Sequence, residues 1–332
     1  ARGFDYISFG PALPNFPDSY RLIPAMLAAS KAAFFSGLMT SPQHGIHLPA
    51  VRACAAVINQ AAPLSPDGFA NLRFAALANV GPGGPFFPAA YHASGAGPAF
   101  ALAIESADEA VAAFREAASL ADARSLLLER LNSGAEKMEE ITRQLALEYP
   151  ADFLGFDFSL APFPIPEISL GGAMESLGVS ALGLSGSLAA AAFVADALDR
   201  GRWKRAGFNG LMLPVLEDAV LAARSLDGSL SVRDLLMYSS VCGTGLDTVP
   251  LPGESSADDL AGLLLDVAAL AVRLGKPLTA RLMPIPGKRA GELTEFNFEY
   301  FANGRVLALP PAGLGRFLTG DEAFRLNPRL AF

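Results

Sequence analysis

The sequence predicts an α/β fold in which parallel strands are joined by crossover helices. Short apolar runs alternate with stretches of helical periodicity along the 332 residues. The runs are continuously apolar rather than alternating, which is typical of strands covered on both faces. Hydrophobic residues make up 52% of the chain and charged residues only 17%. The chain is therefore long and apolar enough for a large core.

The expected strands, in chain order, are residues 4–10, 32–39, 72–78, 100–105, 153–161 and 278–285. Near the end of the chain, Asn303-Gly304 stands between two alternating apolar runs, which is the signal of a two-residue hairpin turn. We therefore expect a C-terminal antiparallel hairpin there. No internal repeat or flexible linker divides the sequence, so we expect a single domain over residues 1–332.

The expected helices lie between these strands. Ser106-x-x-Glu109 has the spacing of a capping box before "AVAAFREA", and Ser256-x-x-Asp259 resembles one before "LAGLLLDVAALAVRLG". The second of these helices should stop at Gly275. Residues 120–148 form a charged amphipathic stretch that we expect to be interrupted at residues 132–134.

Composition excludes several classes of protein. A net charge of −8 leaves no basic face for a phosphate backbone, so we expect no nucleic-acid partner. Residues 74–104 and 176–195 carry no charge, but the first is broken by prolines and the second is rich in Ser, Gly and Ala, so we expect no membrane span. The two cysteines, Cys54 and Cys242, have no metal-like spacing, which suits a reducing, cytoplasmic compartment.

Many polar residues fall where a strand-like run ends, the edge at which α/β folds bind ligands. The candidate catalytic residues are Cys242, Asp247, Glu217, Asp218, Asp157 and His92. The candidate substrate-binding residues are Ser159, Gly243, Gly245, Arg281 and Lys288. Carboxylates of this kind serve as general bases or as ligands of hard metals, but they do not specify a metal, so the metal remains unknown.

Each candidate also has a structural interpretation. Cys242 is either a reactive thiolate, with Gly243 and Gly245 letting backbone N–H groups approach a ligand, or a small buried apolar residue. Glu217-Asp218 is either a site carboxylate pair or a complement to a helix dipole. His92 is either a proton shuttle or a satisfied core histidine.

Two further patterns carry no cofactor prediction. His44-x-x-His47 has a spacing that can ligate metal, but Gly45 lies between the imidazoles and no third ligand of matching type is evident, so we predict no zinc site. The glycine-rich pieces at 81–85, 94–98 and 184–187 match neither the dinucleotide-binding nor the phosphate-binding loop pattern, so the cofactor is unknown. Lys288 and Arg289 lie on a tight loop that suits an anionic substrate or a solvated turn.

A family resemblance rests on an ordered set of motifs. "FDFSLAP", "LPVLEDA", "VCGTGLDTVPLPGE" and "MPIPGKRAGE", together with "HGIHLPAVR" and "AAYHASGAG", resemble the uncharacterised pyruvate-formate-lyase-like family, domain of unknown function 711 (UPF0210). The similarity runs over essentially the whole chain. Members of that family carry further sequence before "FDYISFG", and this chain starts with Ala1, so we expect an N-terminal segment to be missing.

The resemblance implies a barrel-like α/β fold related to glycyl-radical enzymes, and a homodimer. In those enzymes a cysteine on a loop inside the barrel meets a radical-bearing glycine on a C-terminal loop, and Cys242 corresponds in position to that cysteine loop. The glycine normally follows an Arg-Val strand. Here Arg305-Val306 continues into "LALPPAG" without it, so we do not expect radical chemistry.

Two main functions are open at this point. The first is an enzyme acting on a small polar metabolite in a central pocket, with Arg281 or Lys288 holding an anionic group. The second is a non-catalytic metabolite-binding or regulatory protein that uses the same pocket. A structural subunit is a third possibility, which would require a filled barrel.

Overall fold

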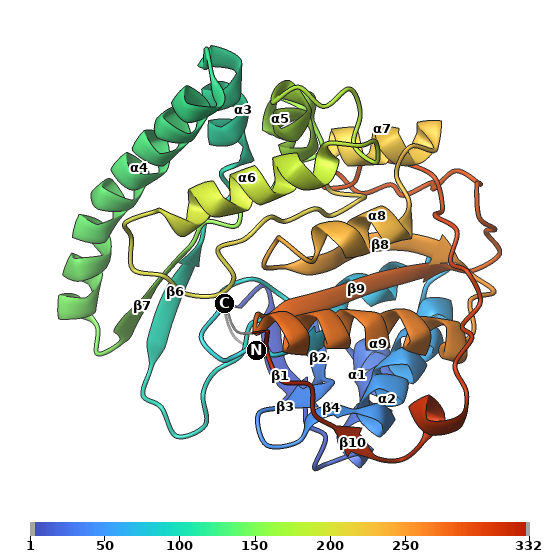
Figure 1. Cartoon of the computed structure of the whole chain (residues 1–332). Coiled ribbons are helices and arrows are strands. Elements are labelled where there is room, and N and C mark those ends of the chain that lie inside the picture. The colour runs from blue at the N-terminus through green and yellow to red at the C-terminus, as the bar shows by residue number, and fades with distance from the viewer. Residues whose placement is uncertain (1–3, 330–332) are drawn as a thin grey trace.

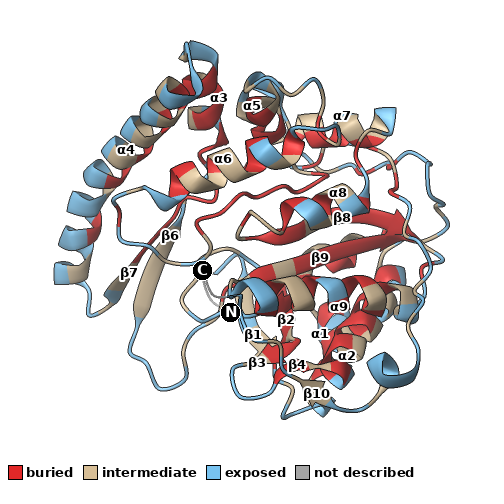
Figure 2. Ribbon diagram, viewed as in Figure 1, coloured by how far each residue is buried: buried red, intermediate tan, exposed pale blue. Residues whose placement is uncertain are grey.

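A five-stranded sheet forms the centre of the computed structural model, which describes residues 4–329. Its strand order is β1-β2-β5-β9-β8. The strands are β1 (Ile7–Ala12), β2 (Ala33–Leu38), β5 (Phe74–Ala78), β9 (Leu278–Ile285) and β8 (Gly245–Pro252). β1, β2 and β5 are parallel to one another, as are β8 and β9, whereas β5 and β9 pair antiparallel. Figure 2 shows β8 and β9 buried along nearly their full length, and most of their residues are apolar.

Three helices cover one face of this sheet: α1 (Asp18–Ala29), α2 (Leu48–Ala61) and α9 (Ala257–Leu274). α2 packs against α1 and α9, and α9 contacts β5 and β9. The expected capping box of α9 is confirmed, since Ser256 and Asp259 bond reciprocally to each other's backbone N–H. The helix ends where predicted, at Gly275, whose φ of 65° is left-handed.

A second group of elements lies on the other side of β8 and β9 in Figure 1. The strands β6 (Ala99–Ala103) and β7 (Asp152–Asp157) form a separate parallel pair. They are connected by α3 (Ala107–Glu116) and α4 (Leu120–Glu148). The remaining helices are α5 (Leu170–Ser176), α6 (Ser187–Asp199), α7 (Ala219–Asp227) and α8 (Val232–Tyr238).

Residues 211–216, which end in a turn that begins at Val215, connect the two groups. The N–H of Met212 donates to the carbonyl of Ser159, just beyond β7, at 2.9 Å, and the N–H of Val215 donates to the carbonyl of Asp247 on β8 at 3.1 Å. The segment therefore lies between β7 and β8 and carries Glu217 to the edge of the central sheet.

A small antiparallel sheet, β10-β4-β3, lies at the end of β2. It consists of β3 (Thr40–Ser41), β4 (Gly45–His47) and β10 (Ala323–Phe324). The C-terminal part of the chain thus does pair antiparallel, but with a segment near the N-terminus.

The mixed α/β class with parallel strands is confirmed, but the expected barrel is not formed. Within residues 4–329 the strands make three sheets, and none of them closes on itself. The described helices also contain no candidate membrane span, since none is both long enough and apolar enough.

Three local predictions were wrong. Asn303-Gly304 is not a two-residue turn, because the Asn303 side chain bonds the backbone of Phe296 and the pairing joins Leu293 with Arg305 across a longer loop. Ser106 makes no capping hydrogen bond at the start of α3. α4 runs without interruption over 29 residues, since a single glycine keeps its backbone N–H and weakens a helix by only about 1 kcal/mol.

Candidate functional site

Three polar side chains from distant parts of the chain meet beside β8 and β9. Arg281 on β9 donates from Nε to Oδ1 of Asp247 on β8 at 2.5 Å, and from Nη2 to Oε1 of Glu217 at 2.9 Å. The side chains of Arg281 and Asp247 are 11% and 14% exposed, and that of Glu217 is 25% exposed. We call these three residues the acid–arginine cluster. Glu217 is its most open member.

Burial controls the charges of the acid–arginine cluster. Loss of solvation raises the pKa of Glu217 to about 7; Arg281 opposes this shift, whereas Asp247 and Glu105 add to it. Burial alone would lower the pKa of Arg281, but the two carboxylates outweigh it and raise the pKa. Glu217 can therefore gain or lose a proton near neutral pH while Arg281 stays charged.

A β-bulge in β8 sets the position of Asp247. Leu246 pairs with Ala280 and Val249 with Leu282, so Asp247 and Thr248 together lie opposite the single residue Arg281. Thr248 adopts a φ of 37°, in the left-handed region, and its N–H donates to Oδ1 of Asp247 at 2.9 Å. The extra residue therefore fixes the carboxylate beside Arg281.

Asp218, the neighbour of Glu217 in the sequence, belongs to a different group of contacts. It is fully buried and is the N-cap of α7. Its carboxylate accepts hydrogen bonds from the N–H groups of Val220, Leu221 and Gly171 at 2.9 to 3.0 Å, and from the Ser169 hydroxyl at 2.6 Å. These bonds hold the starts of α5 and α7 together.

Asp157 and Ser159 form a third group at the end of β7. The Ser159 hydroxyl donates to Oδ1 of Asp157 at 2.5 Å. The same carboxylate accepts the N–H groups of Phe208 and Asn209 at 2.6 and 2.9 Å. Burial raises the pKa of Asp157, and these hydrogen bonds oppose that shift. The pair anchors the turn that leads into residues 211–216.

Cys242 lies after α8 and is 1% exposed. Its Sγ is 3.9 Å from the Thr244 hydroxyl, and the Nζ of Lys276 donates to its carbonyl oxygen. Burial lowers the pKa of Lys276. No side chain of the acid–arginine cluster bonds to this group of residues.

The two glycines after Cys242 allow backbones to approach closely. A Cβ on Gly245, which has a φ of 107°, would lie 2.1 Å from the carbonyl oxygen of Thr279. Gly243 packs against Gly210, and a Cβ on Gly210 would lie 2.6 Å from the backbone nitrogen of Gly243. Their contacts in this structure are with neighbouring backbone.

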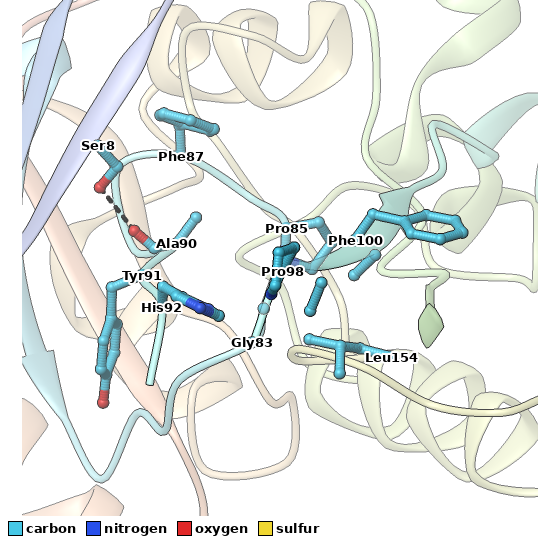
Figure 3. A pocket seen from close by; sticks show the side chains of 13 residues that line it. Ser8, Gly83, Pro85, Phe87, Ala90, Tyr91, His92, Pro98, Phe100 and Leu154 are labelled. Atoms are coloured by element: carbon cyan, nitrogen blue, oxygen red, sulfur yellow. Dashed lines mark hydrogen bonds between the residues drawn. The ribbon is translucent and has the colours of Figure 1, made fainter. Parts of the chain in front are cut away.

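His92 lines an open pocket of about 470 Å³ between β1, the loop at residues 83–92, and the strands β6 and β7. Figure 3 shows its imidazole projecting into the pocket beside Tyr91. The wall is otherwise largely apolar, with Phe87, Phe100 and Leu154 among its members. The two nearby hydroxyls already bond to backbone, Ser8 to Ala90 and Tyr91 to Val80.

Lys288 lies apart from all of these groups. Its Nζ donates to Oε2 of Glu295 at 2.7 Å, and the Glu295 side chain is 75% exposed. Lys288 therefore forms a surface ion pair.

Among the residues predicted for the site, the structure thus joins Glu217, Asp247 and Arg281 in one group and Asp157 with Ser159 in another. Glu105, which acts on the pKa of Glu217, was not predicted. Glu105 is the last residue of the expected strand over residues 100–105, and this position at a strand end could have identified it as a candidate. No sequence spacing linked it to Glu217.

Within residues 4–329, no group of three or more His, Cys, Asp or Glu side chains is arranged to hold a metal ion. The two carboxylates of the acid–arginine cluster are both paired with Arg281.

Comparisons with known proteins confirm the resemblance to the DUF711 (UPF0210) family. The family model described as "Uncharacterised ACR (DUF711)" matches residues 14–299. A UPF0210 protein of Pyrobaculum aerophilum is 35% identical over 278 residues, covering 82% of this chain and 61% of its own length. A UPF0210 protein of Syntrophobacter fumaroxidans is 33% identical over 291 residues, covering 82% of this chain and 63% of its own length. The chain therefore spans somewhat less than two thirds of these relatives.

Proposed function

The chain belongs to the DUF711 family, and we propose that it is an enzyme that acts on a small polar metabolite with Glu217 as its general acid–base. One observation carries this proposal. Oε1 of Glu217 is held by Arg281, whereas Oε2 accepts no hydrogen bond from residues 4–329, and the pKa of the carboxyl group is raised to about 7. A carboxyl group with one oxygen fixed, one free and a pKa near the working pH suits proton transfer.

The neighbours of Glu217 have distinct roles in this proposal. Arg281 orients the carboxyl group and stabilises its charged form, and Asp247 orients Arg281 through the bond to Nε. In the catalytic step, the free oxygen of Glu217 takes a proton from a substrate O–H or N–H group and returns one later.

The charge of the site bears on the substrate. The carboxylates of Glu105, Glu217 and Asp247 outnumber the single guanidinium, and two donors of Arg281 are already used. We therefore place no anionic substrate group on Arg281. A neutral or cationic metabolite suits this charge balance.

A non-catalytic binding function is the second candidate, and the pocket beside His92 favours it. That pocket holds about 470 Å³ and no charged side chain lines it. Such a wall suits binding of a partly apolar ligand more than proton transfer.

The proposal is tested by metabolite depletion. Purified protein is incubated with a small-molecule cell extract, and mass spectrometry identifies compounds that are consumed. We expect Glu217→Gln to lower the rate of consumption by about 100-fold or more, as loss of a general acid–base does. Glu175→Gln is the matched control, since Glu175 is a similarly buried carboxylate paired with Arg224 at 2.7 Å, and it should retain the rate.

Two results would contradict the enzyme proposal. The first is turnover by Glu217→Gln at the rate of the unaltered protein. The second is a rise in melting temperature with a metabolite that is not consumed, which would support the binding function instead.

A further inference from the structure

Two imidazoles converge on one atom in the turn between β3 and β4. Nε2 of His47 is 2.8 Å from the hydroxyl oxygen of Ser41, and Nδ1 of His44 is 3.5 Å from the same oxygen. The ring centroids are 5.6 Å apart and the ring planes are inclined by 73°. Two ring nitrogens from different residues are therefore directed to the same small region.

The backbone that carries these rings is held on both sides. β4 pairs with β10, and a Cβ on Gly45, which has a φ of 76°, would lie 2.4 Å from the carbonyl oxygen of Phe324. On the other side, the hydroxyl of Thr40 accepts the N–H of Asn79 at 2.8 Å. The backbone that carries the rings is therefore already ordered before a ligand binds.

The two rings can be reached from solvent and have no charged partner among the described residues. Neither ring forms an ion pair with a carboxylate in the described part of the chain. His44 is exposed and Ser41 is half-buried, so an ion can enter.

A serine nucleophile activated by His47 is a poorer interpretation of the same contact. A histidine base is normally oriented by a third group bonded to its other ring nitrogen. Within residues 4–329, Nδ1 of His47 has no hydrogen-bond partner.

We propose that His44 and His47 form a two-imidazole chelate for one divalent transition-metal ion of the Ni²⁺, Cu²⁺ and Zn²⁺ class. Such ions prefer imidazole nitrogen, whereas Mg²⁺ prefers oxygen. The Ser41 hydroxyl and water complete the coordination. The site shares no residue with the acid–arginine cluster, so it stands independently of the function proposed above.

The test is a calorimetric titration of the whole chain with Ni²⁺. We expect one saturable site. His44→Ala and His47→Ala should each raise the Kd by about tenfold or more, because a chelate becomes a single contact. The chain has only three histidines, so His92→Ala is a matched control and should bind as the unaltered protein does.

A second measurement reports on the ligands directly. The electron paramagnetic resonance spectrum of one equivalent of bound Cu²⁺ should show coupling to two nitrogens, and to fewer in either variant. The two cysteines are buried and compete little for the ion. Melting curves check that the variants fold, and the exposed position of His44 keeps that variant informative if His47→Ala is unstable.

Three outcomes would overturn the proposal. They are unchanged Ni²⁺ binding by both His44→Ala and His47→Ala, an equal loss of binding in His92→Ala, and displacement of Ni²⁺ by equimolar Mg²⁺.

Discussion

Arg281 is the residue on which the acid–arginine cluster depends. It is the only cation that bonds to Asp247 or Glu217 in the part of the chain that the structure describes. A buried ion pair contributes little relative to an apolar replacement of both partners, but removal of one partner leaves the other charge uncompensated. The cluster is therefore sensitive to the loss of this single side chain.

We predict that Arg281→Met lowers the free energy of unfolding by about 3–5 kcal/mol, because two poorly solvated carboxylates lose their counter-charge. Urea denaturation measures the change. Arg52→Met is the control: Arg52 pairs with Asp321, whose side chain is 93% exposed, and its loss should cost about 1 kcal/mol or less. Equal losses in the two variants would mean that Arg281 is not the counter-charge of a buried cluster.

At the residue scale, the sequence singled out the members of the cluster but not their association. Glu217, Asp247 and Arg281 are all acidic or basic residues near ends of apolar runs, and this made each of them a candidate. Arg281 is 34 residues from Asp247 and 64 from Glu217, so no local spacing joins them. Asp157 and Asp218 had the same sequence signal and instead bond backbone N–H groups.

At the element scale, β8 shows where reasoning from local patterns was wrong. Residues 245–252, which contain Pro250 and Pro252, were not among the expected strands. In the structure β8 is the last strand of its sheet, a position that tolerates proline. The carbonyl of Pro250 still accepts a hydrogen bond from the N–H of Leu307 at 2.9 Å.

Two glycines give a prediction at this scale. Gly245→Ala should destabilise the protein by several kcal/mol, since its Cβ would overlap the carbonyl oxygen of Thr279 and its φ is 107°. Gly134→Ala, in the middle of α4 with open space around it, should stabilise the protein by about 0.5–1 kcal/mol. Thermal unfolding measures the melting temperature of both variants. Shifts of the melting temperature in the same direction would refute this interpretation of Gly245.

At the scale of the whole molecule, the site depends on how two groups of elements meet. β8 and β9 belong to the central sheet, whereas Glu217 follows a segment whose Met212 bonds to Ser159, just beyond the end of β7. Figure 1 shows α1, α2 and α9 on one side of β8 and β9 and α3 to α7 on the other. Glu217 meets Arg281 only when both groups are assembled, so the proton affinity of Glu217 reports on the folded molecule.

The raised pKa of Glu217 makes the stability of the protein depend on pH. The pKa of Glu217 rises from 4.5 to about 7 on folding, so the folded state binds the proton more tightly. The contribution of Glu217 to stability is therefore greatest below pH 4.5 and is lost as pH rises to about 7. In urea denaturation, the free energy of unfolding should decline as the pH rises from about 4.5 to about 7.5, and this decline should be smaller in Glu217→Gln. An identical decline in the variant would contradict the shift. Asp157 and Asp218, whose pKa values burial also raises, contribute a background that both proteins share.

Short stretches of sequence are enough to predict the α/β class, most strand positions, the capped α9 and the residue types available for chemistry. These depend on local periodicity and capping, which residues close in the chain specify. Tertiary structure alone decided that the sheets stay open, that Asn303-Gly304 is not a tight turn, and which acids meet a cation. Strand pairing and burial depend on contacts between distant segments, and the change in solvation they produce raises the pKa of Glu217 to near 7.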